Sequence, residues 1–165
     1  MDPATASAAP PRVRLSTSPD ETREIGRRIG AAAAPGTVVA LVGPLGAGKT
    51  QMAKGIAEGL GITSVVNSPT FVLMNEHAGR LRMYHVDAYR LDNPEEASAA
   101  GLLDERQADG VTVVEWADRL KGWMPVERLD ILLATPAGDP VHRTLAWQAH
   151  GPAHDRLARE ALAAR

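Results

Sequence analysis

The chain has 165 residues, of which 44% are hydrophobic, and a formal net charge of −2. This length and composition suit a single domain around one core, and the slight acidity argues against a protein that grips nucleic acid by itself, because Lys and Arg dominate affinity for phosphate backbones. The sequence contains no cysteine, so disulfides, thiolate zinc sites and cysteine nucleophiles are excluded, and we expect a reducing, cytoplasmic compartment.

The amino-terminal segment does not have the pattern of an export signal. Residues 1–11 are small and rich in Pro and Ala, without a basic start or a long apolar core, so we expect a disordered tail. No run of about 18 apolar residues follows, so we expect no membrane-spanning helix. The single folded domain is expected to comprise residues 12–165.

The first predicted elements are a short strand and a helix. Residues 12–17 alternate Val13 and Leu15 with polar residues, as a half-buried strand does. The helix is predicted to begin at Ser18, an N-cap residue followed by proline at the first helical position and by glutamate three residues after the cap. Pro35-Gly36 is expected to end it.

The next stretch, residues 43–50, reads Gly-Pro-Leu-Gly-Ala-Gly-Lys-Thr and fits the phosphate-binding loop pattern G-x-x-x-x-G-K-[ST] at every position. It follows a β-branched run over 37–42 that suits a buried strand, and it precedes helical residues over 50–60 that Gly61 closes. Strand, loop and helix therefore stand in the order that a phosphate loop requires, and we predict a nucleotide site here.

Each part of this loop has an expected role. Backbone N–H groups should cradle phosphate where glycine permits close approach, so the predicted nucleotide contacts are Gly43, Leu45, Gly46, Ala47, Gly48, Lys49 and Thr50. Lys49, expected to be an exposed loop lysine, would neutralise β- and γ-phosphate oxygens. The Thr50 hydroxyl would bind a Mg²⁺ ion that otherwise keeps water and phosphate ligands. The expected cofactors are therefore ATP or ADP with Mg²⁺.

Beyond this unit the sequence predicts a hairpin. Residues 71–76 and 81–87 flank Ala78-Gly79-Arg80, so antiparallel strands should join the sheet. The two-residue period of a strand places His85 and Asp87 on one face. Asp87 is either a carboxylate at the hairpin end that local backbone satisfies or, beside a phosphate loop, a group that orients water or holds the hydration shell of the metal, and we favour the functional role. His85 is equally a catalytic candidate and a buried, hydrogen-bonded histidine.

Two further residues complete the candidate site. Thr70, in a Ser-Pro-Thr turn, is either a turn hydroxyl or a switch-like catalytic group that senses γ-phosphate. Residues 111–114 form an apolar run that ends in Glu115, which is similar to a Walker B element. Glu115 could merely end a strand, but open α/β sheets bind ligands at the carboxyl ends of their strands, so we expect it to coordinate Mg²⁺ directly or through water. Thr50, Glu115 and Asp87 are thus the predicted metal-binding residues.

The last third of the sequence predicts two strands and a final helix, and one short helix is predicted before them. Strands are expected over 129–135 and 142–150, and a final helix over 155–165. The short helix should begin at Asn93, an N-cap residue followed by proline.

With these elements in place, the chain resembles the TsaE (YjeE) family, small ATPases needed in bacteria to make threonylcarbamoyladenosine beside the tRNA anticodon. The likeness covers almost everything after the tail and depends on motifs in matching order and spacing: Leu45-Gly46-Ala47-Gly48-Lys49-Thr50, Ser68-Pro69-Thr70-Phe71, Asn75-Glu76, His85-Val86-Asp87-Ala88-Tyr89-Arg90-Leu91 and Glu115-Trp116. It implies a three-layer α/β fold of P-loop type, with a mixed parallel and antiparallel central sheet flanked by helices. It also implies TsaB and TsaD as protein partners and only indirect contact with tRNA.

The function that these observations predict is a magnesium-dependent ATPase whose hydrolysis resets a tRNA-modifying complex. Nothing in the sequence announces an arginine finger, so the isolated chain should be slow. A small-molecule kinase would share the phosphate loop but should add an arginine-rich lid, which is not evident in the sequence. A nucleotide-gated assembly subunit with negligible turnover is the other alternative.

Overall fold

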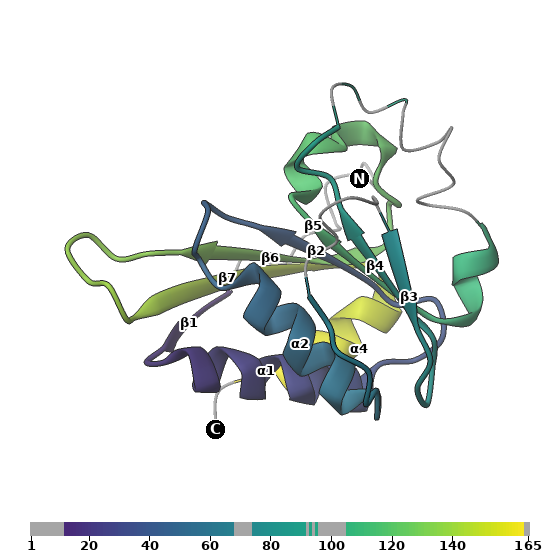
Figure 1. Ribbon diagram of the computed structural model, residues 1–165, viewed down its shortest axis with the longest axis horizontal. Coiled ribbons are helices and arrows are strands. Elements are labelled where there is room, and N and C mark those ends of the chain that lie inside the picture. Colours follow the sequence, from purple (N-terminus) through teal and green to yellow (C-terminus); the bar gives the residue numbers. More distant parts are fainter. Residues whose placement is uncertain (1–11, 68–73, 92, 94, 96–104, 164–165) are drawn as a thin grey trace, which may run out of the picture.

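The computed structural model describes residues 12–67, 74–91, 93, 95 and 105–163 (Figure 1). The strands are β1 (Arg12–Ser16), β2 (Val38–Val42), β3 (Met74–His77), β4 (Met83–Asp87), β5 (Val111–Glu115), β6 (Arg128–Ala134) and β7 (Arg143–His150). The helices are α1 (Pro19–Ala32), α2 (Lys49–Gly59) and α4 (Pro152–Ala161), with short 3-10 helices η2 (Glu105–Asp109), η3 (Ala117–Arg119) and η4 (Lys121–Trp123). The predicted tail, Thr70 and most of the helix expected from Asn93 lie outside the described residues.

All these strands form one seven-stranded sheet of mixed direction, in the order β1-β7-β6-β2-β5-β4-β3. Strand β2 is parallel to both of its neighbours, β5 and β6, and β4 is parallel to β5. The hairpin strand β3 and the strands β7 and β1 are antiparallel to their neighbours. The carboxyl ends of β2, β4 and β5 therefore reach the same edge of the sheet, where open α/β sheets bind ligands.

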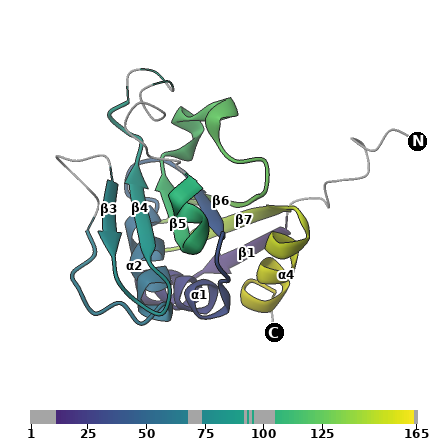
Figure 2. The same ribbon diagram turned by 90° about the vertical axis from the view of Figure 1, so that its right-hand side faces the viewer.

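The sheet lies between two unequal helical layers. Helices α1, α2 and α4 cover one face (Figures 1 and 2), where Ile25, Ile56 and Leu157 pack against the sheet in the larger hydrophobic cluster. The 3-10 helices η3 and η4 lie on the other face, where Leu120 and Met124 belong to the smaller cluster. The predicted α/β fold, a mixed sheet flanked by helices, is confirmed.

The helix termini follow their sequence signals, with one exception. Ser18 caps α1 by accepting a hydrogen bond from the Glu21 backbone N–H at 3.0 Å, as predicted. Helix α4 covers Pro152–Ala161 and so begins and ends earlier than the predicted range 155–165; proline fits the first helical position, and Gly151 adopts the cap with a φ of 93°. Of the helices that the structure describes, none combines the length and the apolar character needed to cross a membrane.

Helices α1 and α2 approach each other so closely that glycine is required between them. A Cβ atom on Gly30 of α1 would lie 2.0 Å from the carbonyl oxygen of Ile56, and one on Gly55 of α2 would lie 2.0 Å from that of Arg23. Both distances are far shorter than any van der Waals contact between carbon and oxygen. This backbone contact fixes the position of α2, and with it the place where the phosphate loop ends.

We predict that Gly30→Ala lowers the free energy of unfolding by about 1–3 kcal/mol, because the new methyl group must push the two helices apart. The helix propensity of alanine, worth about 1 kcal/mol over glycine, offsets only part of this cost. Gly122→Ala is the control, since an added Cβ there meets no atom within 4 Å. Denaturant unfolding measures both variants, and equal stability of the two would contradict this description of the helix contact.

Helix α4 also holds the start of β2. The Nε2 atom of His154 accepts a hydrogen bond from the Val38 backbone N–H at 3.0 Å, and His154 is only 5% exposed. Burial is the main cause that lowers the pKa of His154 below its ordinary value of 6.5, and only a neutral ring can accept this bond. The folded protein therefore binds this proton less readily than the unfolded chain does.

It follows that the stabilisation from His154 is fully present above pH 6.5 and is lost as the pH falls from 6.5 through the lower folded-state pKa. We predict that the wild type has a higher free energy of unfolding than His154→Gln above pH 6.5, and that this difference becomes smaller as the pH falls. The reason is that a glutamine carbonyl can accept the same bond without titrating. Urea unfolding at pH steps tests this, and a difference that does not change with pH would refute it.

Candidate nucleotide-binding site

The loop that joins β2 to α2 depends on glycine at two positions. A Cβ atom on Gly43 would lie 2.3 Å from the carbonyl oxygen of Leu133 in β6, so any side chain there would displace the loop. Gly48, the N-cap residue of α2, has a φ of 104°, in the left-handed region that favours glycine. Between them, Leu45 is 86% exposed while Ala47 is fully buried. The loop is thus anchored to the sheet at its start and turned sharply into the helix at its end.

The amino terminus of α2 has the features of an anion-binding site. No side chain caps it, and its first turn contains no acidic residue. Helix α1 is the opposite case, with Ser18 as a capping side chain and with Asp20 and Glu21 in its first turn. Since the first N–H groups of a helix lack partners within the helix and carry partial positive charge, the end of α2 can bind phosphate.

Lys49 folds back onto the loop that precedes it. Its Nζ atom donates hydrogen bonds to the carbonyl oxygens of Gly43 at 2.6 Å and Pro44 at 2.9 Å. The same atom lies 4.0 Å from the ring centroid of Trp116, within the range of a cation–π interaction. Lys49 is consequently only 5% exposed. The prediction of an exposed loop lysine was wrong, because the loop carbonyls and the indole ring enclose the side chain.

Three carboxylates share this environment with Lys49. Burial lowers the pKa of Lys49, while Glu115, Asp118 and Asp87 oppose that shift by favouring the charged ammonium. Phosphate oxygens placed on the end of α2 would meet these acids as well as the ammonium. A divalent cation between phosphate and carboxylate would remove that repulsion.

Glu115 connects two of the predicted site residues. Its Oε1 atom accepts a hydrogen bond from the Thr50 hydroxyl at 3.0 Å, and its Oε2 atom lies 2.5 Å from Nε2 of His85. Glu115 is 2% exposed and His85 is fully buried. The three side chains come from β5, α2 and β4, so the fold brings together residues that the sequence analysis had selected separately.

This donor set fits Mg²⁺. A hydroxyl and a carboxylate are oxygen ligands of the kind that the ion prefers, and with a nucleotide it needs only one or two protein ligands because it keeps water and phosphate. Within the described part of the chain, no three His, Cys, Asp or Glu side chains are grouped so as to hold a metal by themselves. Thr50 and Glu115 would therefore hold Mg²⁺ jointly with the nucleotide.

Asp87 lies beside Glu115 at the edge of the sheet. The two residues are directly opposite each other in the parallel pair of β4 and β5, so their side chains leave the same face. The Asp87 carboxylate also accepts a hydrogen bond from the Tyr89 backbone N–H at 2.9 Å, which shapes the turn after β4. The structure thus places Asp87 next to the Thr50–Glu115 pair, while Thr70, the remaining predicted site residue, is outside the described residues.

Trp116 has an unusual backbone conformation at this site. With φ 59° and ψ 40°, it is the one non-glycine residue with positive φ in the described ranges. Its ring contacts Tyr89, with centroids 4.8 Å apart, and Lys49 also lies over it. A bulky residue in this region of φ and ψ is strained, and such strain persists where surrounding contacts hold it, often at functional sites.

Two residues near the loop were not predicted from the sequence. Asp118 follows Glu115 by three positions, and this spacing of acids could have suggested it. Arg143, at the start of β7, donates a hydrogen bond to the carbonyl oxygen of Gly46 at 3.2 Å. No signal in the sequence marks Arg143, since it reaches the loop only through the pairing of β7 with β6.

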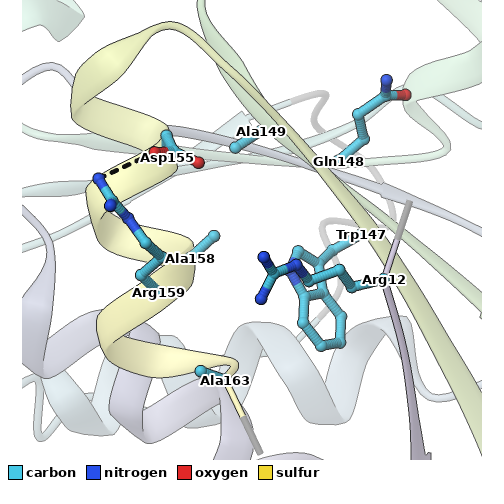
Figure 3. Close-up of a pocket in the computed structure, with 8 residues that line it drawn as sticks. All are labelled: Arg12, Trp147, Gln148, Ala149, Asp155, Ala158, Arg159 and Ala163. Atoms are coloured by element: carbon cyan, nitrogen blue, oxygen red, sulfur yellow. Dashed lines mark ion pairs between the residues drawn. The ribbon is translucent and has the colours of Figure 1, made fainter. Parts of the chain in front are cut away.

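A hollow between α4 and the β1–β7 pair offers no second candidate site. Arg12 and Trp147 line it on one side and Arg159 on the other, where Arg159 is paired with Asp155 at 2.9 Å (Figure 3). Its volume of about 40 Å³ accommodates a few water molecules at most, too little for a nucleotide.

Comparison with known proteins places these features in one family. Residues 16–144 match the family model described as "Threonylcarbamoyl adenosine biosynthesis protein TsaE". A relative from Bacillus subtilis, named tRNA threonylcarbamoyladenosine biosynthesis protein TsaE, is 42% identical over 88% of this chain and 90% of its own. A relative of the same name from Treponema pallidum is 40% identical over 72% of this chain and 88% of its own. The crystal structure of Bacillus subtilis YdiB superposes with a TM-score of 0.75 at 36% identity, covering 93% of this chain and 94% of that one.

Proposed function

Since this chain belongs to the TsaE family of tRNA threonylcarbamoyladenosine biosynthesis, we propose that it is the subunit that binds and hydrolyses ATP with Mg²⁺ in that pathway. The main support for the proposal is the hydrogen bond of 3.0 Å between Thr50, in the first turn of α2, and the buried Glu115. It lies at the amino terminus of α2, which no side chain caps. This arrangement pairs a phosphate site with a magnesium site.

In this proposal the phosphates of ATP rest on the N–H groups of the loop and of the first turn of α2. Lys49 exchanges the carbonyl oxygens of Gly43 and Pro44 for phosphate oxygens, which are better partners for an ammonium because they carry charge. Magnesium, when bound, supplies positive charge to the β- and γ-phosphate oxygens. Asp87 orients the attacking water, and hydrolysis yields ADP and inorganic phosphate.

The proposed protein partners are TsaB and TsaD, and tRNA is reached only through them. The net charge of −2 supports indirect contact, because direct binding of tRNA would call for an excess of basic residues. Arg143 contacts the loop, but its hydrogen bond goes to the carbonyl oxygen of Gly46, so we do not assign it as the arginine finger that would speed hydrolysis. We therefore expect slow hydrolysis by the isolated chain and faster hydrolysis when the partners complete the site.

The first prediction from the proposed function concerns Lys49. The change Lys49→Met should weaken binding of Mg²⁺-ATP by about 10- to 100-fold, the range expected when a hydrogen bond to a charged group is lost. Methionine keeps an aliphatic chain against Trp116, so the thermal midpoint should change little. Lys54→Met on the same helix is the control, because it removes an equal charge outside the loop. Isothermal titration calorimetry measures the affinity.

Two results would separate this function from its alternatives. Unchanged ATP affinity in a folded Lys49→Met variant would overturn the assignment of the phosphate loop. Single-turnover hydrolysis with and without TsaB and TsaD tests the second half of the proposal. An absence of phosphate release under both conditions would favour a nucleotide-gated assembly subunit, and transfer of phosphate to a small molecule would favour a kinase.

The second prediction separates the roles of the two acids. Mg²⁺ should strengthen ATP binding about tenfold less in Glu115→Gln than in the wild type, because the metal loses a charged ligand. Asp87→Asn should leave Mg²⁺-ATP affinity nearly intact and lower the single-turnover rate by about 100-fold or more, as expected for a group that acts in the transition state. The reverse pattern, with the rate lost at Glu115 and metal dependence lost at Asp87, would exchange the two roles.

A further inference from the structure

We infer that His85 determines the cation selectivity of this site by occupying one oxygen of Glu115, so that the carboxylate can offer only its other oxygen to a divalent cation. This inference rests on the proposed function, because it concerns how the proposed metal–nucleotide site selects its metal. In this inference His85 is a positioning residue, because it acts through Glu115. It therefore corresponds to the buried, hydrogen-bonded histidine that the sequence left open as an alternative to a catalytic one.

The two oxygens of Glu115 are in different situations. The Oε2 atom lies 2.5 Å from Nε2 of His85, and because a carboxylate can only accept, the imidazole nitrogen donates its proton. The Oε1 atom faces the Thr50 hydroxyl at 3.0 Å, on the side of the phosphate loop. One oxygen is therefore directed into the protein and the other toward the cation site.

The contact with His85 is not readily given up. His85 is fully buried and Glu115 is 2% exposed, so water does not compete for the carboxylate. The two residues lie on adjacent, hydrogen-bonded strands, β4 and β5, beneath the layer that contains α2. A close-packed interior leaves the ring no room to rotate away, and a buried carboxylate that lost this donor would be left poorly compensated.

Divalent cations differ in how they use a carboxylate. Mg²⁺ takes six ligands in octahedral geometry at about 2.0–2.1 Å and accepts single oxygens from one or two carboxylates. Ca²⁺ takes about 6–8 oxygens at about 2.3–2.6 Å and often uses both oxygens of one carboxylate. Because Oε2 is directed at His85 and Oε1 toward the loop, Glu115 could bind in the two-oxygen mode only by turning Oε2 away from its donor. The site therefore favours Mg²⁺ over Ca²⁺ by geometry rather than by charge.

His77 offers a matched comparison on the neighbouring strand. It pairs with Met83 in the register of β3 and β4, so its side chain leaves the same face of the sheet as that of His85. Its Nδ1 atom, however, lies 2.9 Å from the hydroxyl of Ser64. A change at His77 thus perturbs a histidine in the same region without removing the donor to Glu115.

The experiment compares the affinity of ATP in the presence of Mg²⁺ with that in the presence of Ca²⁺, by isothermal titration calorimetry on the full chain. The wild type should prefer Mg²⁺. In His85→Leu the ratio of the two affinities should fall by about tenfold, the equivalent of one hydrogen bond to a charged group. His85→Gln should keep the ratio, because its terminal amide can donate to Oε2 as Nε2 does, and His77→Gln should keep it as well.

Each outcome bears on one proposal at a time. An unchanged ratio in a folded His85→Leu variant would overturn the inference and leave the proposed function standing, whereas a wild-type chain that binds ATP with neither cation would overturn the proposed function. If His85→Leu does not fold, as a melting curve would reveal, His85→Asn replaces it, because its shorter amide cannot reach Oε2. Equal ratios for His85→Asn and His85→Gln would then also overturn the inference.

Discussion

The buried carboxylate of Glu115 is the constraint on which the rest of this site depends. An unpaired charge in a protein interior costs several kcal/mol, so its two oxygens need donors. Thr50 and His85 provide them at 3.0 Å and 2.5 Å. One donor comes from the helix that follows the phosphate loop and the other from a neighbouring strand, so a single carboxylate ties the loop, α2 and the centre of the sheet into one unit.

The location of that unit is set by backbone packing on the helical face. The glycines of α1 and α2 bring the two helix backbones into contact, and a side chain at Gly30 or Gly55 would meet the backbone of the opposite helix. Because α2 begins at Lys49, this contact decides where the loop ends and where Thr50 can reach. The geometry of the nucleotide site is therefore coupled to helix packing, as well as to the residues that would touch phosphate.

The charged side chains of the site are paired with other groups of the protein. Lys49 is bonded to loop carbonyls and covered by the strained Trp116, and Glu115 is bonded on both oxygens. A nucleotide must replace these contacts with better ones, which a charged phosphate and its metal can provide.

The sequence by itself determined the features that depend on neighbours in the chain. The loop pattern, the cap at Ser18 and the alternation that places His85 and Asp87 on one face are local, because glycine conformation, capping and strand periodicity act over a few residues. Most strands were predictable on that basis, and the resemblance to the TsaE family, which depends on short motifs in matching order, implied the mixed sheet. The tertiary structure alone decided the contact of Lys49 with Trp116, the approach of Arg143 to Gly46 and the contact between Glu115 and His85. These contacts join residues 30 to 97 positions apart, so they follow from strand order and core packing, which no local pattern encodes.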